Sequence, residues 1–285
     1  MEPKFTPARA AIYILLIFFA LYALAPLYVM IVTSLKSLDE IRAGNLLSLP
    51  HSLTAEAWAK AWGSACIGVR CEGLAPFFWN SIAMTVPAVL ICSVIGAFNG
   101  YVLAHWRFRG SEIIFTALLV GCFIPFQVVL LPMARLLGAL GLSSTTTGLI
   151  IVHVIYGLAF TTLFFRNYYV AIPAELIKAA RVDGAGFLTI FWRILLPISG
   201  PIIMVSIIWE FTQIWNDFLF GVVYSGVDSQ PITVALNNLV NTTTGVKEYN
   251  VDMAAAIIAA LPTLFVYIIA GKYFVRGLTA GAVKG

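Results

Sequence analysis

Long apolar stretches alternate with short polar segments along the chain. Six of these stretches are long enough to cross the hydrocarbon of a membrane, which takes about 20 residues of helix. They cover residues 10–33, 79–104, 113–136, 146–166, 198–223 and 254–275. Prolines interrupt several of them, and such breaks are tolerated where neighbouring helices satisfy the freed backbone groups. The pattern predicts an all-α, polytopic membrane protein with six transmembrane helices.

The composition supports this class. Of the 285 residues, 61% are hydrophobic and 11% are charged, whereas soluble domains carry about 25% charged residues. The net charge of +4 comes from bases that form no dense patch, so we expect no nucleic-acid partner. Lys and Arg favour the segments on one side of the predicted membrane, and the positive-inside rule then places both termini in the cytoplasm. Residues 36–77 and 224–253 become outside loops, the first with short surface helices, and neither is large enough to be a domain beside the single domain 1–285.

Cysteines and histidines offer little catalytic chemistry. Cys66 and Cys71 share the outside loop 36–77. An oxidising compartment would allow a local disulfide between them, and two separate thiols are the alternative. The three histidines are scattered, so we expect no metal site and no histidine-based catalytic cluster. The chain also contains no G-x-x-x-x-G-K-[ST] phosphate loop, so it is not expected to hold ATP in that way.

A charged segment rich in small residues separates the fourth and fifth apolar stretches. It reads IPAELIKAARVDGAGFLTIFWRILLPISGP. Pro173 suits the first turn of a short helix, and Glu175 complements the positive end of the helix dipole. Ala179 and Ala180 give this helix a small face that can accept a close partner. By orientation, the segment lies on the cytoplasmic side.

A turn and a second short helix are expected to follow. Gly184 and Gly186 permit positive φ angles, and Asp183 can cap exposed backbone donors. The stretch FLTIFWRILLP predicts an amphipathic helix that ends before Pro197. The two helices would form a compact projection, and a simple connecting loop is the alternative reading of the same spacing.

This segment resembles the cytoplasmic coupling loop of ABC-importer permeases, whose pattern runs Glu-Ala-Ala, Asp-Gly-Ala and Ile-x-Leu-Pro. The matching residues are Ala179, Ala180, Asp183, Gly184, Ala185, Ile194, Leu196 and Pro197. Four other stretches, WNSIAMT, IPFQVVLLPMARLLGALGLSSTTTGLII, WNDFLFGVV and GKYFVRGLTAGAVKG, resemble the carbohydrate branch of the same family, of the maltose-permease type. Together they cover most of the core 78–285. One position departs from the pattern, because Lys178 stands where the family usually has Glu.

The resemblance implies the type I ABC-importer permease fold and a translocation subunit rather than an enzyme. It places the chain in a bacterial inner membrane, in contact with lipid. The implied partners are a second, different permease subunit, a homodimeric cytoplasmic ATPase and a periplasmic sugar-binding protein. ATP and Mg²⁺ would bind the ATPase, and this chain would hold no cofactor. Glucose or mannose is the favoured substrate, with oligosaccharides and glycerol phosphate left open.

The resemblance also assigns roles to residues. The coupling helices, 173–197, would contact the ATPase through Glu175, Lys178, Ala179, Ala180, Asp183, Gly184, Ala185, Leu196 and Pro197. A C-terminal tail with Arg276, Gly277, Leu278 and Thr279 would reach between the ATPase subunits.

Polar residues inside the predicted spans form a second candidate group. Glu210 and Asp217 lie seven residues apart on one face of the fifth span, with Gln213 and Asn216 between them. Intramembrane acids mark functional or network sites by default, and in this family they support gating or the subunit interface more often than they bind sugar. Gln127 is a weaker candidate. Two other functions compete with the importer subunit: an ion-coupled secondary carrier, which would need a coupling acid, and a membrane enzyme, whose usual motifs are absent.

Overall fold

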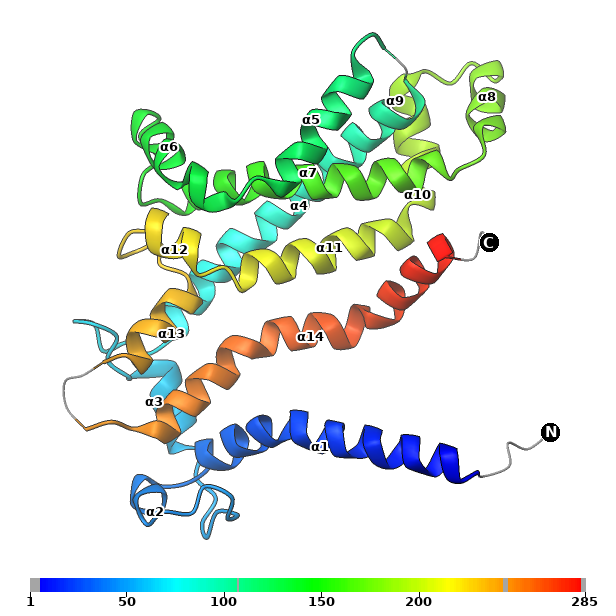
Figure 1. Ribbon diagram of the computed structural model, residues 1–285. Helices are drawn as coiled ribbons and strands as arrows, with labels where there is room; N and C mark the ends of the chain where they lie inside the picture. The colour runs from blue at the N-terminus through cyan, green and yellow to red at the C-terminus, as the bar shows by residue number, and fades with distance from the viewer. Residues whose placement is uncertain (1–5, 107, 243–245, 283–285) are drawn as a thin grey trace. The chain divides into compact units, whose positions relative to one another are not determined.

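The computed structural model describes residues 6–106, 108–242 and 246–282, and side chains as far as Gly271. Over this part of the chain the elements are helices, with one isolated bridge between Ile67 and Arg70. The longest helices are α1 (Pro7–Ser34), α4 (Ala75–His105), α7 (Thr146–Val170) and α14 (Tyr249–Ala282), shown in Figure 1. The all-α prediction is confirmed.

The six predicted spans correspond to four long helices and two bent pairs. Among the described residues, α1, α4, α7 and the Tyr249–Gly271 part of α14 are each long and apolar enough to cross a membrane. The first bent pair is α5 (Ser111–Phe123) with α6 (Phe126–Ala139), at 103°. The second joins the helical stretch Phe187–Ile198 to α11 (Gly200–Trp215), at 78°. Counted with one span for each bent pair, the described residues provide up to six candidate spans.

The third span is broken, which corrects the prediction of one helix over 113–136. Ile124 has extended backbone angles, φ −68° and ψ 121°, and Pro125 has φ −59° and ψ 123°. A residue before proline avoids the helical region because its backbone would clash with the proline ring. The 13 residues of α5 extend about 20 Å, which is too short for hydrocarbon of about 30 Å.

The fifth span is shorter than the predicted 198–223. It ends at Trp215, and a separate short helix, α12 (Leu219–Tyr224), follows. The Asp217 carboxylate accepts hydrogen bonds from the Phe220 and Gly221 amides, at 3.3 and 3.1 Å. Because these are donors of a helical first turn, the carboxylate stabilises a new helix start at this point.

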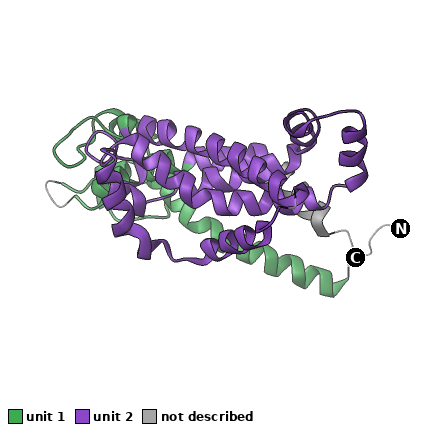
Figure 2. Ribbon diagram, turned by 90° about the horizontal axis from the view of Figure 1, so that it is seen from above, with its two compact units in different colours: residues 1–76, 235–260 green, residues 77–234, 261–285 purple. Residues whose placement is uncertain are grey.

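The chain forms two compact units, residues 1–76 with 235–260 and residues 77–234 with 261–285 (Figure 2). In the larger unit, α4 and α7 pack closely through two glycines. A Cβ at Gly96 would lie 2.6 Å from the Thr161 Cβ, and one at Gly100 would lie 2.6 Å from the Phe165 Cβ. The spacing Gly-x-x-x-Gly is typical of close helix contacts in membranes. The single domain over 1–285 stays a prediction.

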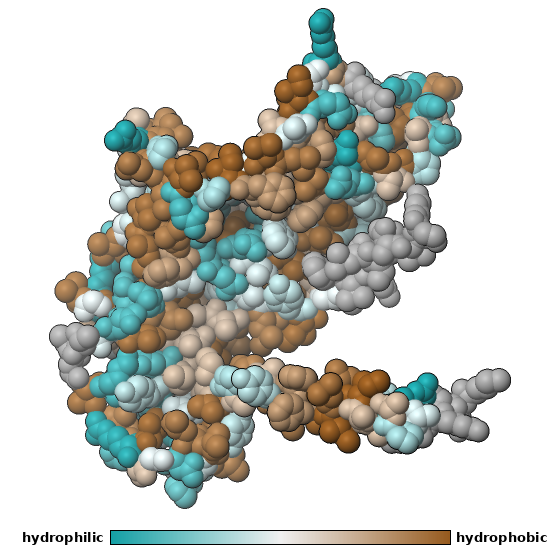
Figure 3. Space-filling view, viewed as in Figure 1, coloured by the Kyte–Doolittle hydropathy of each residue, from teal (hydrophilic) through white to brown (hydrophobic). Residues whose placement is uncertain are grey.

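The smaller unit contains the predicted outside-loop helices, α2 (Leu38–Arg42) and α3 (Glu56–Gly63). Lys36 is 1% exposed and donates to the Asn45 carbonyl at 2.9 Å and the Ser48 hydroxyl at 3.0 Å. Cys66 and Cys71 form a disulfide with a Cα–Cα distance of 3.8 Å. The apolar side chains of α1 are exposed along most of the helix (Figure 3), as suits a helix that faces lipid.

The second outside loop, 224–253, is also partly helical. It contains α13 (Ile232–Val240).

Candidate functional site

The predicted coupling segment folds as a helical knob, which we define as residues 173–198. It consists of α8 (Ala174–Val182), α9 (Phe187–Ile190), the π-helical turn η1 (Phe191–Leu195) and α10 (Leu196–Ile198). The helix does not end before Pro197, as predicted, but continues to Ile198. The Leu196 amide bonds five residues back to the Phe191 carbonyl, and Pro197 lies in the first turn of the next segment, where its missing N–H is tolerated.

Gly184 terminates α8 in a tight turn. Its φ of +81° is in the left-handed region, which side chains disfavour. The Ala185 amide donates to the Ala180 carbonyl at 2.9 Å, and the Gly184 amide donates to the Arg181 carbonyl at 3.1 Å. This pair of bonds is the Schellman arrangement. The positive φ that the sequence predicts for the turn is therefore present at Gly184.

Two other expectations about this turn, a positive φ at Gly186 and a capping side chain at Asp183, are not met. Gly186 has φ −72°, which any residue adopts, and no side chain caps α9. Asp183 is the C-cap of α8, so the expected capping role of its side chain is wrong. Because the Schellman bonds already satisfy the carbonyls at the end of α8, the turn closes without a side-chain cap.

One face of the knob packs on α4 and α7. Its buried side chains are Ile177, Ala180, Ile190, Phe191 and Leu195. The Tyr101 ring of α4 stacks on Phe187 at 4.8 Å and on Phe191 at 5.7 Å, and its hydroxyl donates to the Phe187 carbonyl at 3.2 Å. The Trp106 ring meets Phe187 at 4.7 Å, and the Arg181 guanidinium lies over Trp106 at 4.9 Å. The knob is thus held to α4 by aromatic side chains.

The opposite face of the knob is exposed. Of the predicted coupling residues, Glu175, Lys178, Ala179, Asp183, Gly184 and Pro197 are exposed, Ala185 and Leu196 are half-buried, and Ala180 is buried. The prediction that Ala179 and Ala180 form one small face is wrong, because the helix turns Ala180 toward α4 and α7 and leaves Ala179 exposed. The exposed face also carries Val182 and Trp192, which are 88% and 53% exposed.

Two tyrosines of α7 hold the bend where the knob joins α11. The Tyr168 hydroxyl donates to the Ile198 carbonyl at 2.8 Å. The Ser199 hydroxyl donates to the Leu195 carbonyl at 2.5 Å and lies 3.0 Å from the Tyr169 hydroxyl. The knob is therefore tied to α7 as well as to α4.

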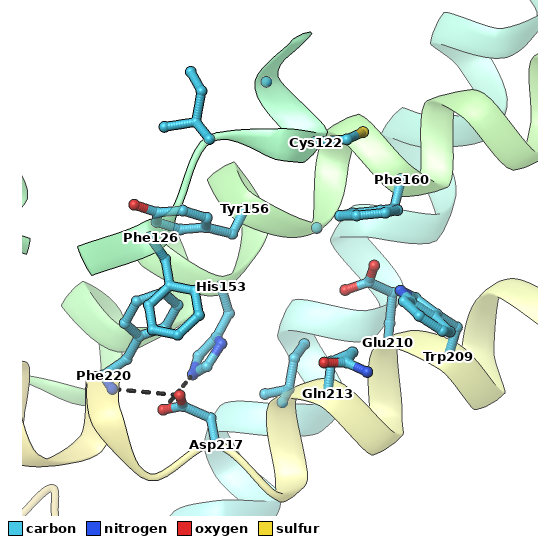
Figure 4. Close-up of a pocket in the computed structure, with 14 residues that line it drawn as sticks. Cys122, Phe126, His153, Tyr156, Phe160, Trp209, Glu210, Gln213, Asp217 and Phe220 are labelled. Carbon is cyan, nitrogen blue, oxygen red and sulfur yellow. Dashed lines mark hydrogen bonds and ion pairs between the residues drawn. The ribbon is translucent and has the colours of Figure 1, made fainter. Parts of the chain in front are cut away.

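A cavity of about 290 Å³ lies where the two broken spans meet α7 (Figure 4). Its aromatic lining consists of Phe126, Tyr156, Phe160, Trp209 and Phe220. Its polar lining consists of His153, Glu210, Gln213 and Asp217. The cavity therefore combines flat apolar surfaces with a few polar groups, as ligand sites do.

The cavity includes three of the predicted intramembrane residues. Glu210 is 2% exposed and Gln213 is exposed. Asp217 lies beyond the end of α11, so it does not share a helix with Glu210, but it lines the same cavity. Asn216 and Gln127 are exposed and do not line it. Asn216 is the C-cap of α11, and its side-chain amide donates to the Thr212 carbonyl at 2.9 Å.

Sequence reasoning missed the contribution of α7. His153, Tyr156, Gly157 and Phe160 follow the spacing i, i+3, i+4, i+7, which places them on one helix face. A histidine on that face of an apolar span is the signal that could have found them. A Cβ at Gly157 would lie 2.8 Å from the Cys92 sulfur and would collide with the Glu210 carboxylate. Glycine at this position therefore makes room for the acid.

Within the described residues, no group of His, Cys, Asp and Glu could hold a metal ion. The tail residues Arg276, Gly277, Leu278 and Thr279 lie outside the residues whose side chains the structure describes.

Four long apolar helices and two bent pairs, with a polar cavity in the larger unit, are the architecture of a membrane protein. Residues 77–280 match the family described as binding-protein-dependent transport system inner membrane component. The chain is 37% identical to a probable ABC transporter permease protein of Pyrococcus horikoshii, over 99% of both chains. It is 32% identical to the xylose/arabinose import permease protein of Haloferax volcanii, covering 96% of this chain and 93% of that protein.

A solved structure has the same fold. A chain of a bacterial ABC transporter involved in the import of the acidic polysaccharide alginate aligns with a TM-score of 0.82 and 22% identity, over 96% of this chain and 100% of that chain. The chain belongs to the binding-protein-dependent transport system inner membrane component family. It is a permease subunit of an ABC importer, a translocation subunit with the type I fold, and the alternative of an ion-coupled carrier finds no support.

Proposed function

We propose that this permease carries sugar into the cell as one of two different permease subunits of a single importer. A periplasmic sugar-binding protein delivers the sugar, and a homodimeric ATPase in the cytoplasm drives the cycle. The full-length similarity to a xylose/arabinose import permease supports a sugar as the substrate. The excess of Lys and Arg in alternate loops supports cytoplasmic N- and C-termini in an inner membrane.

The two-faced knob carries this proposal. Its inner face packs through Phe187 and Phe191 on Tyr101 of α4. Its outer face leaves Glu175, Lys178 and Gly184 exposed. Among the described residues, neither Glu175 nor Lys178 forms an ion pair. These charges are therefore free to contact the ATPase, and Glu175 takes the place of the acid that Lys178 replaces.

Nucleotide binding then biases the permease between two states. ATP and Mg²⁺ bind the ATPase, whose closure moves the knob. Because the knob is held to α4 and α7 by stacked rings and hydrogen bonds, it moves those helices as a rigid lever. The tail with Arg276, Gly277, Leu278 and Thr279 adds a second contact to the ATPase dimer.

Reconstitution tests this function. The chain, its second permease, the ATPase and the binding protein are placed in proteoliposomes, and uptake of radiolabelled xylose, arabinose and glucose is measured with and without ATP inside. We expect uptake only with ATP and all subunits present. Uptake by this chain alone, driven by a proton or sodium gradient, would contradict the proposal.

A further inference from the structure

The cavity of about 290 Å³ is lined by residues near the break at 124–125, on one face of α7 and at the end of α11. We propose that it binds one ring of a neutral sugar and disfavours anionic sugars. The inference rests on the importer function proposed above, and it adds that this subunit itself contacts and selects the sugar. Four observations support it: an unsatisfied histidine, a buried acid, paired aromatic rings and the charge of the lining.

His153 offers a buried polar atom with no hydrogen-bond partner. The side chain is 5% exposed, and its Nε2 atom has no hydrogen-bond partner. The nearest Asp217 oxygen is 3.9 Å away, which is too far for a hydrogen bond, and Figure 4 shows the ring pointing toward that carboxylate. Buried polar atoms without partners are rare and need an explanation. A ligand hydroxyl in the cavity can supply the missing partner.

Glu210 provides acceptors from the other wall. Its side chain comes from α11, lines the cavity and fits only because position 157 is glycine. A carboxylate accepts hydrogen bonds through both oxygens, and the hydroxyls of a sugar are donors. Gln213, one helical turn further on, adds an amide that both donates and accepts.

Aromatic side chains supply the apolar surfaces. The Phe160 and Trp209 rings are 5.8 Å apart, and the Tyr156 and Phe220 rings are 4.8 Å apart. Such rings offer flat apolar faces with large contact area, which match the C–H face of a pyranose. The cavity is near the lower end of ligand-site volumes, about 300–1,000 Å³, so one sugar ring fits better than an oligosaccharide.

The charge of the lining determines which sugars are accepted. Glu210 and Asp217 both line the cavity, and none of its described lining residues is Lys or Arg. An anionic ligand would lose its hydration without gaining a Lys or Arg partner from the described lining. Neutral hexoses and pentoses are therefore accepted, whereas uronates and sugar phosphates are rejected.

A native cysteine reports occupancy of the cavity. Cys122 lines it, whereas Cys92 is buried and Cys66 is paired with Cys71. The complete importer is incubated without nucleotide with a small maleimide, and the rate of Cys122 alkylation is followed by mass spectrometry. The neutral probes are D-glucose, D-xylose and L-arabinose, and the anionic probes are D-glucuronate and glucose 6-phosphate.

We expect at least one neutral probe to slow alkylation about tenfold at ten times its apparent dissociation constant, because the free fraction falls by that factor. The anionic probes should give no protection at the same concentration. In a Cys122→Ala background, a cysteine introduced by Val128→Cys serves as control. Val128 is 68% exposed on α6 and outside the cavity lining, so its alkylation should not respond to sugar.

Two variants test whether protection of Cys122 comes from sugar bound in the cavity. Glu210→Gln keeps the size of the side chain and replaces its acid by a neutral amide, so the difference in protection between glucose and glucuronate should narrow. Gly121→Leu should abolish protection, because Gly121 lines the cavity and its Cβ would meet nothing within 4 Å. The matched control, Gly138→Leu on α6, lies outside the lining and should leave protection unchanged.

Several results would overturn the inference. No protection by any neutral probe would reject the subsite, even if ATP-driven uptake of sugar is normal, in which case the proposed function stands. Equal protection by glucose and glucuronate in the unmodified chain would reject the selection by charge. Protection that survives Gly121→Leu would place the sugar elsewhere. Failure of the proposed function would appear separately, as absent ATP-driven uptake, because the alkylation assay needs no ATP.

Discussion

The helices α6 and α8 end in the same glycine turn but lie in different surroundings. After α6, Gly141 has φ +68°, and the Leu142 amide bonds to the Leu137 carbonyl at 2.8 Å. After α8, Gly184 has φ +81° with the equivalent Schellman bonds. A Cβ would meet nothing within 4 Å at either glycine. Figure 1 shows α6 and α8 at opposite ends of the larger unit.

What lies beneath the two turns differs. Beneath the α6 turn, Leu137 belongs to a mixed cluster in which Met84 and Leu149 pack with the rings of Phe220 and Tyr224. Beneath the α8 turn, the knob rests on stacked aromatic rings that continue into α4. The backbone costs of the two turns are alike, so any difference in function between them must come from what each turn is attached to and what it contacts. Matched substitutions at the two turns therefore separate effects on coupling to the ATPase from effects on folding.

The largest effect is expected beneath the α8 turn. Tyr101→Ala removes a fully buried aromatic side chain and should destabilise the chain by about 3–5 kcal/mol. It should also lower the number of sugar molecules carried per ATP, because the knob loses its stacked contact with α4. Leu137→Ala, at 1% exposure, should destabilise by about 2–5 kcal/mol and leave that ratio unchanged. For both variants, the thermal midpoint and the number of sugar molecules transported per ATP hydrolysed are measured. An equal fall of this ratio in Tyr101→Ala and Leu137→Ala would show that the two turns do not differ in coupling.

A smaller effect is expected from a milder change in the same contact between Tyr101 and the knob. Tyr101→Phe keeps the ring stacking and removes only the hydroxyl that donates to the Phe187 carbonyl. The loss should be about 0.5–1.5 kcal/mol, with most of the coupling retained. The thermal midpoint and uptake rate are the measurements. Coupling as poor as in Tyr101→Ala would mean that the hydrogen bond, and not the stacking, transmits the motion.

Sequence reasoning located the spans and the α8 turn but not the directions of side chains. Hydropathy averaged over twenty residues is enough to find a span, and the glycine in VDGAG is enough to predict a left-handed turn. The side that Ala180 faces depends on the packing of α4 and α7, which no local pattern contains. Likewise, Pro125 could kink a helix or break it, and only its neighbours decide which.

The cavity itself was not predicted from the sequence. Glu210 and Asp217 are visible as acids in an apolar stretch and were expected on one face of one helix; the helix ends between them, and both line the cavity. His153 was set aside because the histidines are far apart in sequence, and only the fold brings it to 3.9 Å from Asp217. The pairing of Cys66 with Cys71 was left open, because it depends on the compartment as well as on spacing.

The smallest expected effect concerns arginines near the two turns. Arg181→Ala removes a cation–π contact with Trp106, worth about 0.5–1 kcal/mol at an exposed site, and should weaken ATPase binding slightly. Arg135→Ala, exposed on α6, is the matched change near the other turn and should leave the complex unaltered. Titration of the detergent-solubilised permease pair with ATPase measures both affinities. Equal affinities for the two variants would show that the Arg181 contact is not part of the docking surface.

The most direct test compares Gly184→Val with Gly141→Val in the complete reconstituted importer. Each substitution forces a β-branched residue into the left-handed region and should strain its turn by about 1–3 kcal/mol. Sugar-stimulated ATP hydrolysis and co-elution of the ATPase are then measured. Gly184→Val should lose most of the stimulation or release the ATPase, whereas Gly141→Val, equally strained, should retain both. Unimpaired stimulation in Gly184→Val, or an equal loss in both variants, would contradict a coupling role for the knob.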